Sequence, residues 1–114
     1  MDIQVTKESA ILFSCIYKEY RHRRKNGMSF SKAANFSLFD DFNSGPCAGM
    51  TQKDIMRCAD ELKRAGLVRS YAVDFSLTDD GITYAEQRGL KDEDIQKWID
   101  RLISAVSAVV PLLP

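Results

Sequence analysis

Side chains that could act as nucleophiles or general bases are few and scattered along this chain of 114 residues. Its single histidine, His22, lies inside a basic run, and its three cysteines are Cys15, Cys47 and Cys58. Covalent catalysis needs a nucleophile and a base within hydrogen-bond reach, and no motif pairs His22 with a cysteine. An isolated histidine is usually a surface residue. The sequence therefore does not predict an enzyme.

The cysteines and acids do not indicate a metal site, a cofactor or a disulfide framework. The cysteine count is odd and the chain has no CxxC pair and no glycine-rich phosphate loop. Cys58 falls on the apolar face of a predicted helix, so we expect it to be buried. Cys47 lies in a loop and is expected to be the exposed cysteine, which leaves a redox-sensor role open. The adjacent acids at 40–41 and 79–80 are typical of turns and helix starts.

Basic side chains are the remaining candidates for a functional surface. Sixteen Lys and Arg residues balance sixteen Asp and Glu residues, so the whole chain has no net charge that would attract nucleic acid. The distribution is uneven, because residues 1–78 carry twelve basic and nine acidic residues while residues 79–114 carry four and seven. The positive part also contains the clearest predicted helix.

That helix is expected over residues 51–66. Thr51 and Asp54 fit the capping-box pattern, and Gly66 fits the glycine that ends a helix. Apolar residues at helical spacing define one buried face, formed by Ile55, Cys58, Ala59 and Leu62. The opposite face carries charged residues that are either solvated or functional, namely Lys53, Arg57, Asp60 and Arg64.

A long first helix is expected over residues 6–26, apolar on nearly all sides and therefore central and buried. It ends in the basic run 21–25, which either complements the helix dipole or binds phosphate. A short helix near 29–38 and a loop at 43–46 follow. Two segments rich in β-formers, 67–71 and 73–77, predict a small antiparallel hairpin.

The chain is expected to end in two helices, one from Thr78 to about residue 88 and one over residues 92–110. The last helix carries an apolar stripe that includes Ile95, Trp98, Ile99, Leu102, Ile103 and Val106. This stripe must pack on the first helix or meet its counterpart in a second subunit. Because residues 109–114 would be poorly covered in a lone monomer, we expect a homodimer through this helix.

Two segments carry a resemblance to a known family. The segment DELKRAGLVRSY, residues 60–71, places a leucine one turn before a glycine stop and then continues into β-formers. The segment FSLTDDGITYAEQR, residues 75–88, leaves a strand through Leu-Thr and passes two acids and a glycine into a helix. Both resemble winged-helix domains of the MarR and PadR kind and small winged-helix proteins of bacteria and phages. The resemblance covers about residues 6–90.

The resemblance implies an α+β, mainly helical fold, with a winged helix-turn-helix over residues 1–90. It implies a short two-stranded hairpin as the wing, and the C-terminal helix and apolar tail at 91–114 are an addition. Residues 51–65 would be the recognition helix of a transcriptional regulator that binds double-stranded DNA. The implied contacts to DNA are Gln52, Lys53, Arg57 and Arg64, with Arg69 in the wing. Arg23 and Arg24 in the basic run are further candidates, for contact with the DNA backbone.

Two features depart from that family pattern and favour a different function. The turn around Ala72 leaves almost no wing tip, and Asp60 lies among the proposed DNA-reading cations, where it repels phosphate. Such a surface suits a winged helix that serves as an adaptor for another protein, for example one encoded by a phage or another mobile element. No signal peptide and no apolar stretch of the roughly 18 residues that span a bilayer are visible, so we expect a cytoplasmic protein.

Overall fold

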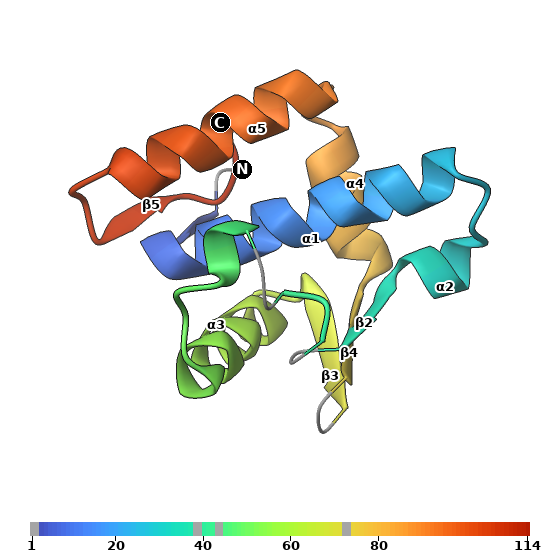
Figure 1. Ribbon diagram of the computed structural model, residues 1–114, viewed down its shortest axis with the longest axis horizontal. Helices are drawn as coiled ribbons and strands as arrows, with labels where there is room; N and C mark the ends of the chain where they lie inside the picture. The colour runs from blue at the N-terminus through green and yellow to red at the C-terminus, as the bar shows by residue number, and fades with distance from the viewer. Residues whose placement is uncertain (1–2, 38–39, 43–44, 72–73) are drawn as a thin grey trace.

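The chain folds around one central helix that has other helices on two sides and a small sheet at one edge (Figure 1). The computed structural model describes residues 3–37, 40–42, 45–71 and 74–114. The helices are α1 (Lys7–Lys25), α2 (Phe30–Ala33), the 3₁₀ turn η1 (Gly45–Cys47), α3 (Gln52–Arg64), α4 (Asp79–Glu86) and α5 (Asp92–Ser104). The strands are β1 (Gln4–Thr6), β2 (Asn35–Ser37), β3 (Val68–Tyr71), β4 (Asp74–Leu77) and β5 (Val109–Pro111). The fold is α+β and mainly helical, as the sequence predicts.

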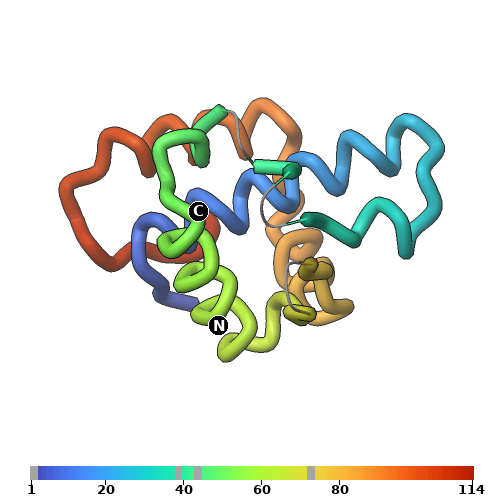
Figure 2. Tube along the Cα trace, turned by 60° about the horizontal axis from the view of Figure 1, so that its bottom comes forward, coloured from blue at the N-terminus to red at the C-terminus, as the bar shows by residue number. Residues whose placement is uncertain are grey.

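Helix α1 is buried along most of its length because its apolar residues lie on nearly every side. It packs against α5 and α3, which lie on different sides of it (Figures 1 and 2). The predicted central helix is therefore confirmed, to within one residue at each end. Its fully or nearly buried apolar side chains are Ala10, Ile11, Leu12, Phe13, Ile16, Tyr17 and Tyr20.

Strand β2 adds a third strand to the hairpin, giving an antiparallel sheet of order β2-β4-β3. Phe36 of β2 lies opposite Phe75 of β4, their ring centroids are 5.7 Å apart, and Phe42 packs against both rings. The helix expected over 29–38 is wrong beyond α2. Pairing with β4 satisfies the backbone here and places Phe36 in the aromatic cluster. The turn around Ala72 lies outside the described residues.

The C-terminal tail is covered within the monomer, contrary to expectation. The last helix ends at Ser104, and β5 pairs antiparallel with β1, with Val5 opposite Val110. The backbone N–H of Leu112 then donates to the carbonyl of Ile3 at 2.8 Å. Val110, Leu112 and Leu113 are each at most 7% exposed. The expected helix over 92–110 is therefore wrong beyond Ser104, and the strand places Val110, with Leu112 and Leu113 after it, against the core.

The apolar stripe of α5 is mostly covered by α1. Ile95, Ile99 and Leu102 are at most 1% exposed. Trp98 is half-buried, and its indole N–H donates to the carbonyl of Leu112 at 3.2 Å. The stripe therefore does not need a second subunit to be covered, and the two residues of the expected dimer interface that stay exposed are Ile103 and Val106.

Replacing Ile99 by Ala should lower the free energy of unfolding by about 2–5 kcal/mol, because it opens a cavity between α5 and α1. The matched control is Ile103→Ala on the same helix, where the side chain is half exposed and the change should stay within about 0.5 kcal/mol. Urea unfolding monitored by circular dichroism measures both. Equal effects of the two substitutions would contradict the packing of α5 described above.

The junction between β4 and α4 explains the Leu-Thr-x-x-Gly motif at residues 77–81. Thr78 caps α4 by accepting from the backbone N–H of Gly81 at 2.9 Å, and its hydroxyl donates to the carbonyl of Gly66 at 2.6 Å. Gly81 lies so close to the turn between α3 and β3 that a Cβ there would be 2.3 Å from the carbonyl oxygen of Leu67. The glycine therefore permits the close approach of α4 to the end of α3.

Replacing Gly81 by Ala should destabilise the fold by about 1–3 kcal/mol, because the added methyl group overlaps a backbone carbonyl and forces α4 away. An unobstructed helix position would show the opposite sign, since Ala is the better helix former by about 1 kcal/mol. Gly49→Ala is the control for the added methyl group itself, because Gly49 lies in a turn outside the helices and a Cβ there meets nothing within 4 Å. Thermal unfolding of the two variants tests the sign, and a stabilised Gly81→Ala protein would refute the close contact.

Candidate nucleic-acid interface

Helix α3 forms as its local sequence predicts. The hydroxyl of Thr51 accepts from the backbone N–H of Asp54 at 3.1 Å, and the Asp54 carboxylate accepts from the backbone N–H of Thr51 at 3.3 Å. Gly66 ends the helix with a φ of 80°, which a glycine adopts without strain. The predicted buried face is confirmed for all of its members, which are Ile55, Cys58, Ala59 and Leu62.

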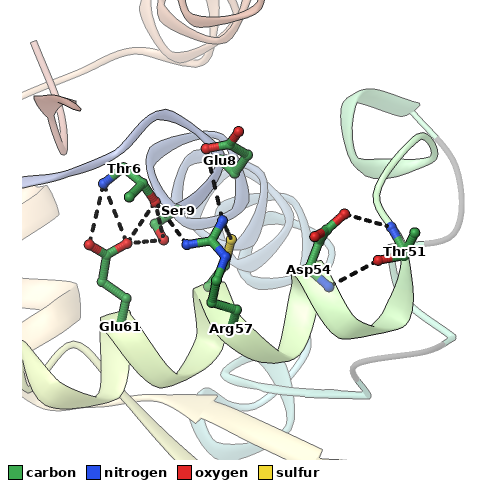
Figure 3. A network of polar contacts seen from close by, with 8 residues as sticks. Thr6, Glu8, Ser9, Thr51, Asp54, Arg57 and Glu61 are labelled. Atoms are coloured by element: carbon green, nitrogen blue, oxygen red, sulfur yellow. Dashed lines mark hydrogen bonds and ion pairs between the residues drawn. The ribbon is translucent and has the colours of Figure 1, made fainter. Parts of the chain in front are cut away.

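A carboxylate on the inner side of α3 holds the first turn of α1 (Figure 3). Glu61 accepts from the hydroxyl of Thr6 at 2.7 Å, from the Thr6 backbone N–H at 3.3 Å and from the hydroxyl of Ser9. Thr6 is the N-cap of α1, and its own side chain does not cap that helix. Glu61 therefore supplies both a cap and a negative charge at the positive end of the α1 dipole.

These contacts shift the protonation of Glu61. Burial raises the pKa of the carboxyl group, but the hydrogen bonds from Ser9 and Thr6 outweigh it and the nearby Arg57 guanidinium adds to them. The pKa of Glu61 therefore lies below its ordinary value. The carboxylate form is the one that binds α1, so the link between the two helices holds while Glu61 is ionised.

Arg57 is partly engaged by the same turn of α1 (Figure 3). Its guanidinium lies 3.9 Å from the carboxylate of Glu8 and 3.5 Å from the hydroxyl of Thr6. About half of its side chain stays exposed. Arg57 was predicted to reach DNA from the outer face of α3. The structure instead places it at the edge of that face, beside the N-terminus of α1.

The outer face of α3 carries a mixed set of side chains. Arg64 pairs with Asp60 at 3.3 Å, one turn apart, and both are more than 60% exposed. An exposed pair of this kind contributes less than about 1 kcal/mol and opens readily. The sequence did not single out Met56 or Lys63 on this surface. The exposed residues of the face are Gln52, Lys53, Met56, Arg57, Asp60, Lys63 and Arg64.

The basic run at the end of α1 lies away from this surface (Figures 1 and 2). Arg21 and Lys25 both bind the carboxylate of Asp92 at the start of α5, Arg21 at 2.8 Å. Hydrogen bonds from Lys25 and Arg21 hold the pKa of Asp92 below its ordinary value. These two cations therefore join α1 to α5, and the run does not continue into the cations of α3.

Arg23 and Arg24, which were predicted DNA contacts, also bind within the chain. Arg23 donates to the carbonyl of Asn35 at 2.8 Å and pairs with Asp41 at 3.1 Å. Its guanidinium lies 4.4 Å from the ring centroid of Phe36, and only 16% of its side chain is exposed. Arg24 is exposed and donates to the carbonyl of Met28 at 3.1 Å. Arg23 thus fastens β2 to α1.

Arg69, the predicted wing cation, is exposed on β3. It lies opposite Ser76, which in turn lies opposite Asn35, so these three residues form one row across the sheet. Phe36 and Phe75, one position along, point to the other face, which is buried. Arg69 therefore lies on the solvent face of the sheet.

The polar cluster that positions α3 was not found from the sequence. Glu61 is more than fifty residues away in the sequence from Thr6 and Ser9, and each of the three has an ordinary local role as a cap or a helix-surface residue. The sequence feature that comes closest to indicating this cluster is Thr6 at the N-cap position of α1. It does not show which group binds the polar atoms at the start of that helix. The partner could be identified only once α3 had been packed against that turn.

Comparison of the chain with protein-family models, curated proteins and solved structures finds no match. None of the helices in the described parts of the chain is long and apolar enough to cross a membrane. Among those same residues, no group of three or more His, Cys, Asp and Glu side chains could hold a metal ion. The geometry around α3 is therefore the basis for assigning a function.

Replacing Glu61 by Gln should destabilise the fold by about 1–2 kcal/mol at neutral pH, the range for a lost helix cap. Because the folded pKa is lowered, the stabilisation by Glu61 is fully present above the ordinary glutamate pKa and is lost as the pH falls through the folded pKa. The variant should therefore show a shallower loss of stability on acidification than the wild type.

Denaturant unfolding at a series of pH values from neutral to acidic measures both effects. The matched control is Glu86→Gln, which removes the charge of an exposed glutamate on α4. If Glu61→Gln and Glu86→Gln unfold alike at every pH, the Glu61 carboxylate does not hold the two helices together.

Proposed function

We propose that residues 1–90 form a winged helix in which α3 is the recognition helix. The order of elements supports this assignment, because α1 and the short helix α2 are followed by the strand β2, the 3₁₀ turn η1, α3 and the β3–β4 hairpin. The sheet order also fits, since β2, the first strand of the three-stranded sheet, pairs with the second strand of the hairpin, β4. In this assignment η1 takes the place of the helix that precedes the recognition helix, and β3 and β4 form the wing.

The function that this geometry supports best is binding of double-stranded DNA by α3, as expected of a transcriptional regulator in the cytoplasm. The observation that carries it is the uncovered outer face of α3, which begins with Gln52 and Lys53 and ends with Lys63 and Arg64. A helix of 13 residues is about 20 Å long and fits the major groove. Its first turn is the part that usually reaches base edges.

The charge on this face sets how tightly DNA is held. Lys53 and Lys63 are exposed, Arg64 shares its charge with Asp60, and Arg57 shares its charge with Glu8. Such a surface neutralises only about two or three phosphates, so the dependence of affinity on salt should be shallow. Specific contacts from Gln52 and Lys53 would then provide much of the discrimination between sequences.

Replacing Lys53 or Lys63 by Ala should weaken binding to a pool of random duplexes and lower the salt slope by about one counterion each. The matched control is Lys97→Ala, which removes an exposed lysine on α5. Helix α5 lies on the other side of α1 from α3 (Figure 1). Fluorescence anisotropy over a range of salt concentrations gives the slopes. A wild-type protein that binds no duplex at low salt, or α3 variants that match Lys97→Ala, would exclude α3 as a DNA reader.

A second candidate function is docking of a protein partner on the same face of α3. The observation that favours it is Met56, which is 52% exposed in the middle of the face, between Lys53 and Asp60. An exposed methionine flanked by both signs of charge suits an adaptable protein contact better than a phosphate backbone. Failure of the wild type to bind duplex DNA at low salt would favour this function over the first.

A further inference from the structure

A cavity of about 340 Å³ lies between the middle of α1, the segment around η1 and α5. Two cysteines from distant parts of the chain line it, Cys15 on α1 and Cys47 in η1. Charged side chains of both signs, Lys18, Glu19 and Asp41, line the same space. The cavity is therefore polar enough to admit a small polar molecule, and it is separate from the outer face of α3.

The two thiols differ in access, although both line the same cavity. Cys47, expected from the sequence to be the exposed cysteine, is in fact 1% exposed because η1 packs on α1, whereas Cys15 is half-buried. A hydrogen bond from Cys47 lowers the pKa of Cys15 more than burial raises it, and the charge of Lys18 lowers it further. The same hydrogen bond and burial raise the pKa of Cys47.

The third cysteine provides an internal comparison. Cys58 lies on the inner face of α3 and is fully buried, and burial raises the pKa of its thiol. The thiolate is the reactive form of cysteine. Cys15 is thus the accessible thiol with the lowered pKa, and it opens into the cavity. The thiol of Cys47 lines the same cavity.

We propose that Cys15 and Cys47 form a redox-active dithiol that reacts with a hydroperoxide entering this cavity. The Cys15 thiolate attacks the terminal oxygen of the peroxide, the O–O bond breaks, and hydroxide or alkoxide leaves and takes up a proton. Cys15 is thereby oxidised to a sulfenic acid. The sulfur of Cys47 then attacks the sulfur of Cys15, the S–O bond breaks, and a disulfide forms as water leaves with the Cys47 proton.

The disulfide would join α1 to the segment that leads into α3. Cys47 precedes the capping residue Thr51 by four positions, and η1 packs directly on α1. A covalent link there closes a long loop of the chain and restricts the unfolded state. The oxidised protein should therefore melt at a higher temperature than the reduced protein. This inference does not depend on whether α3 binds DNA.

Treatment of the reduced wild-type protein with hydrogen peroxide tests the proposal. We expect two of the three thiols to be lost, the intact mass to fall by two hydrogens, and peptide mapping under non-reducing conditions to join the peptides of Cys15 and Cys47. Cys58→Ser should behave in the same way, with both of its remaining thiols lost. Three thiols that persist, or a disulfide that involves Cys58 or a second chain, would overturn the proposal.

Trapping of the intermediate separates the roles of the two cysteines. In Cys47→Ser the sulfenic acid at Cys15 has no resolving thiol, so dimedone should label Cys15. In Cys15→Ser neither a label nor a disulfide should form. Circular dichroism establishes that each variant is folded, and where a variant is not, the peptide map of the wild type decides alone. Equal labelling of Cys15 and Cys58 in folded Cys47→Ser would contradict the assigned order.

Discussion

The Glu61 carboxylate accepts from the backbone N–H of Thr6 and from the hydroxyl groups of Thr6 and Ser9, and this contact fixes how α3 lies on α1. The apolar contacts of α3 bury one face but are not directional, so they tolerate some rotation about the helix axis. Hydrogen bonds to a carboxylate require a narrow range of angles. The polar contact therefore determines which residues α3 turns outward, and so which residues can form a recognition surface.

The same first turn of α1 is held from a second direction by the C-terminal tail. Strand β1 leads directly into α1 and pairs with β5, and the backbone N–H of Lys7 donates to the carbonyl of Ala108 at 2.9 Å. Strands β1 and β5, near the two ends of the chain, consequently lie side by side (Figure 1). Because α5 packs on the opposite side of α1 from α3, the tail supports the helix that carries α3 and does not extend the outer face of α3.

Local signals in the sequence predicted the helices more reliably than the strands. Helix α3 has its capping box, its glycine stop and its apolar period within sixteen residues, so nothing distant is needed to define it. Val109 and Val110 continue the apolar period of α5, and only pairing with β1, a hundred residues away, makes them a strand. The burial of Phe36 and Cys47 likewise depends on distant parts of the chain. Phe36 is covered through its pairing with β4, and Cys47 is covered because η1 packs on α1. In the candidate site, the sequence was enough to locate the exposed cations of α3. It was not enough to identify the acidic side chains with which Arg57 and Arg64 pair.

Positive and negative charges cancel over the whole chain, and many of the basic side chains also pair with a nearby carboxylate. Arg21 and Lys25 bind Asp92, Arg23 binds Asp41, and on α3 itself Arg57 and Arg64 face Glu8 and Asp60. Three cations of the basic run, Arg21, Arg23 and Lys25, therefore make tertiary contacts that join α1 to α5 and to β2. A protein arranged in this way has little long-range attraction for a polyanion. If α3 is a recognition helix, as proposed above, its partner is held by close contact along that helix, where shape and hydrogen bonds discriminate more strongly than charge.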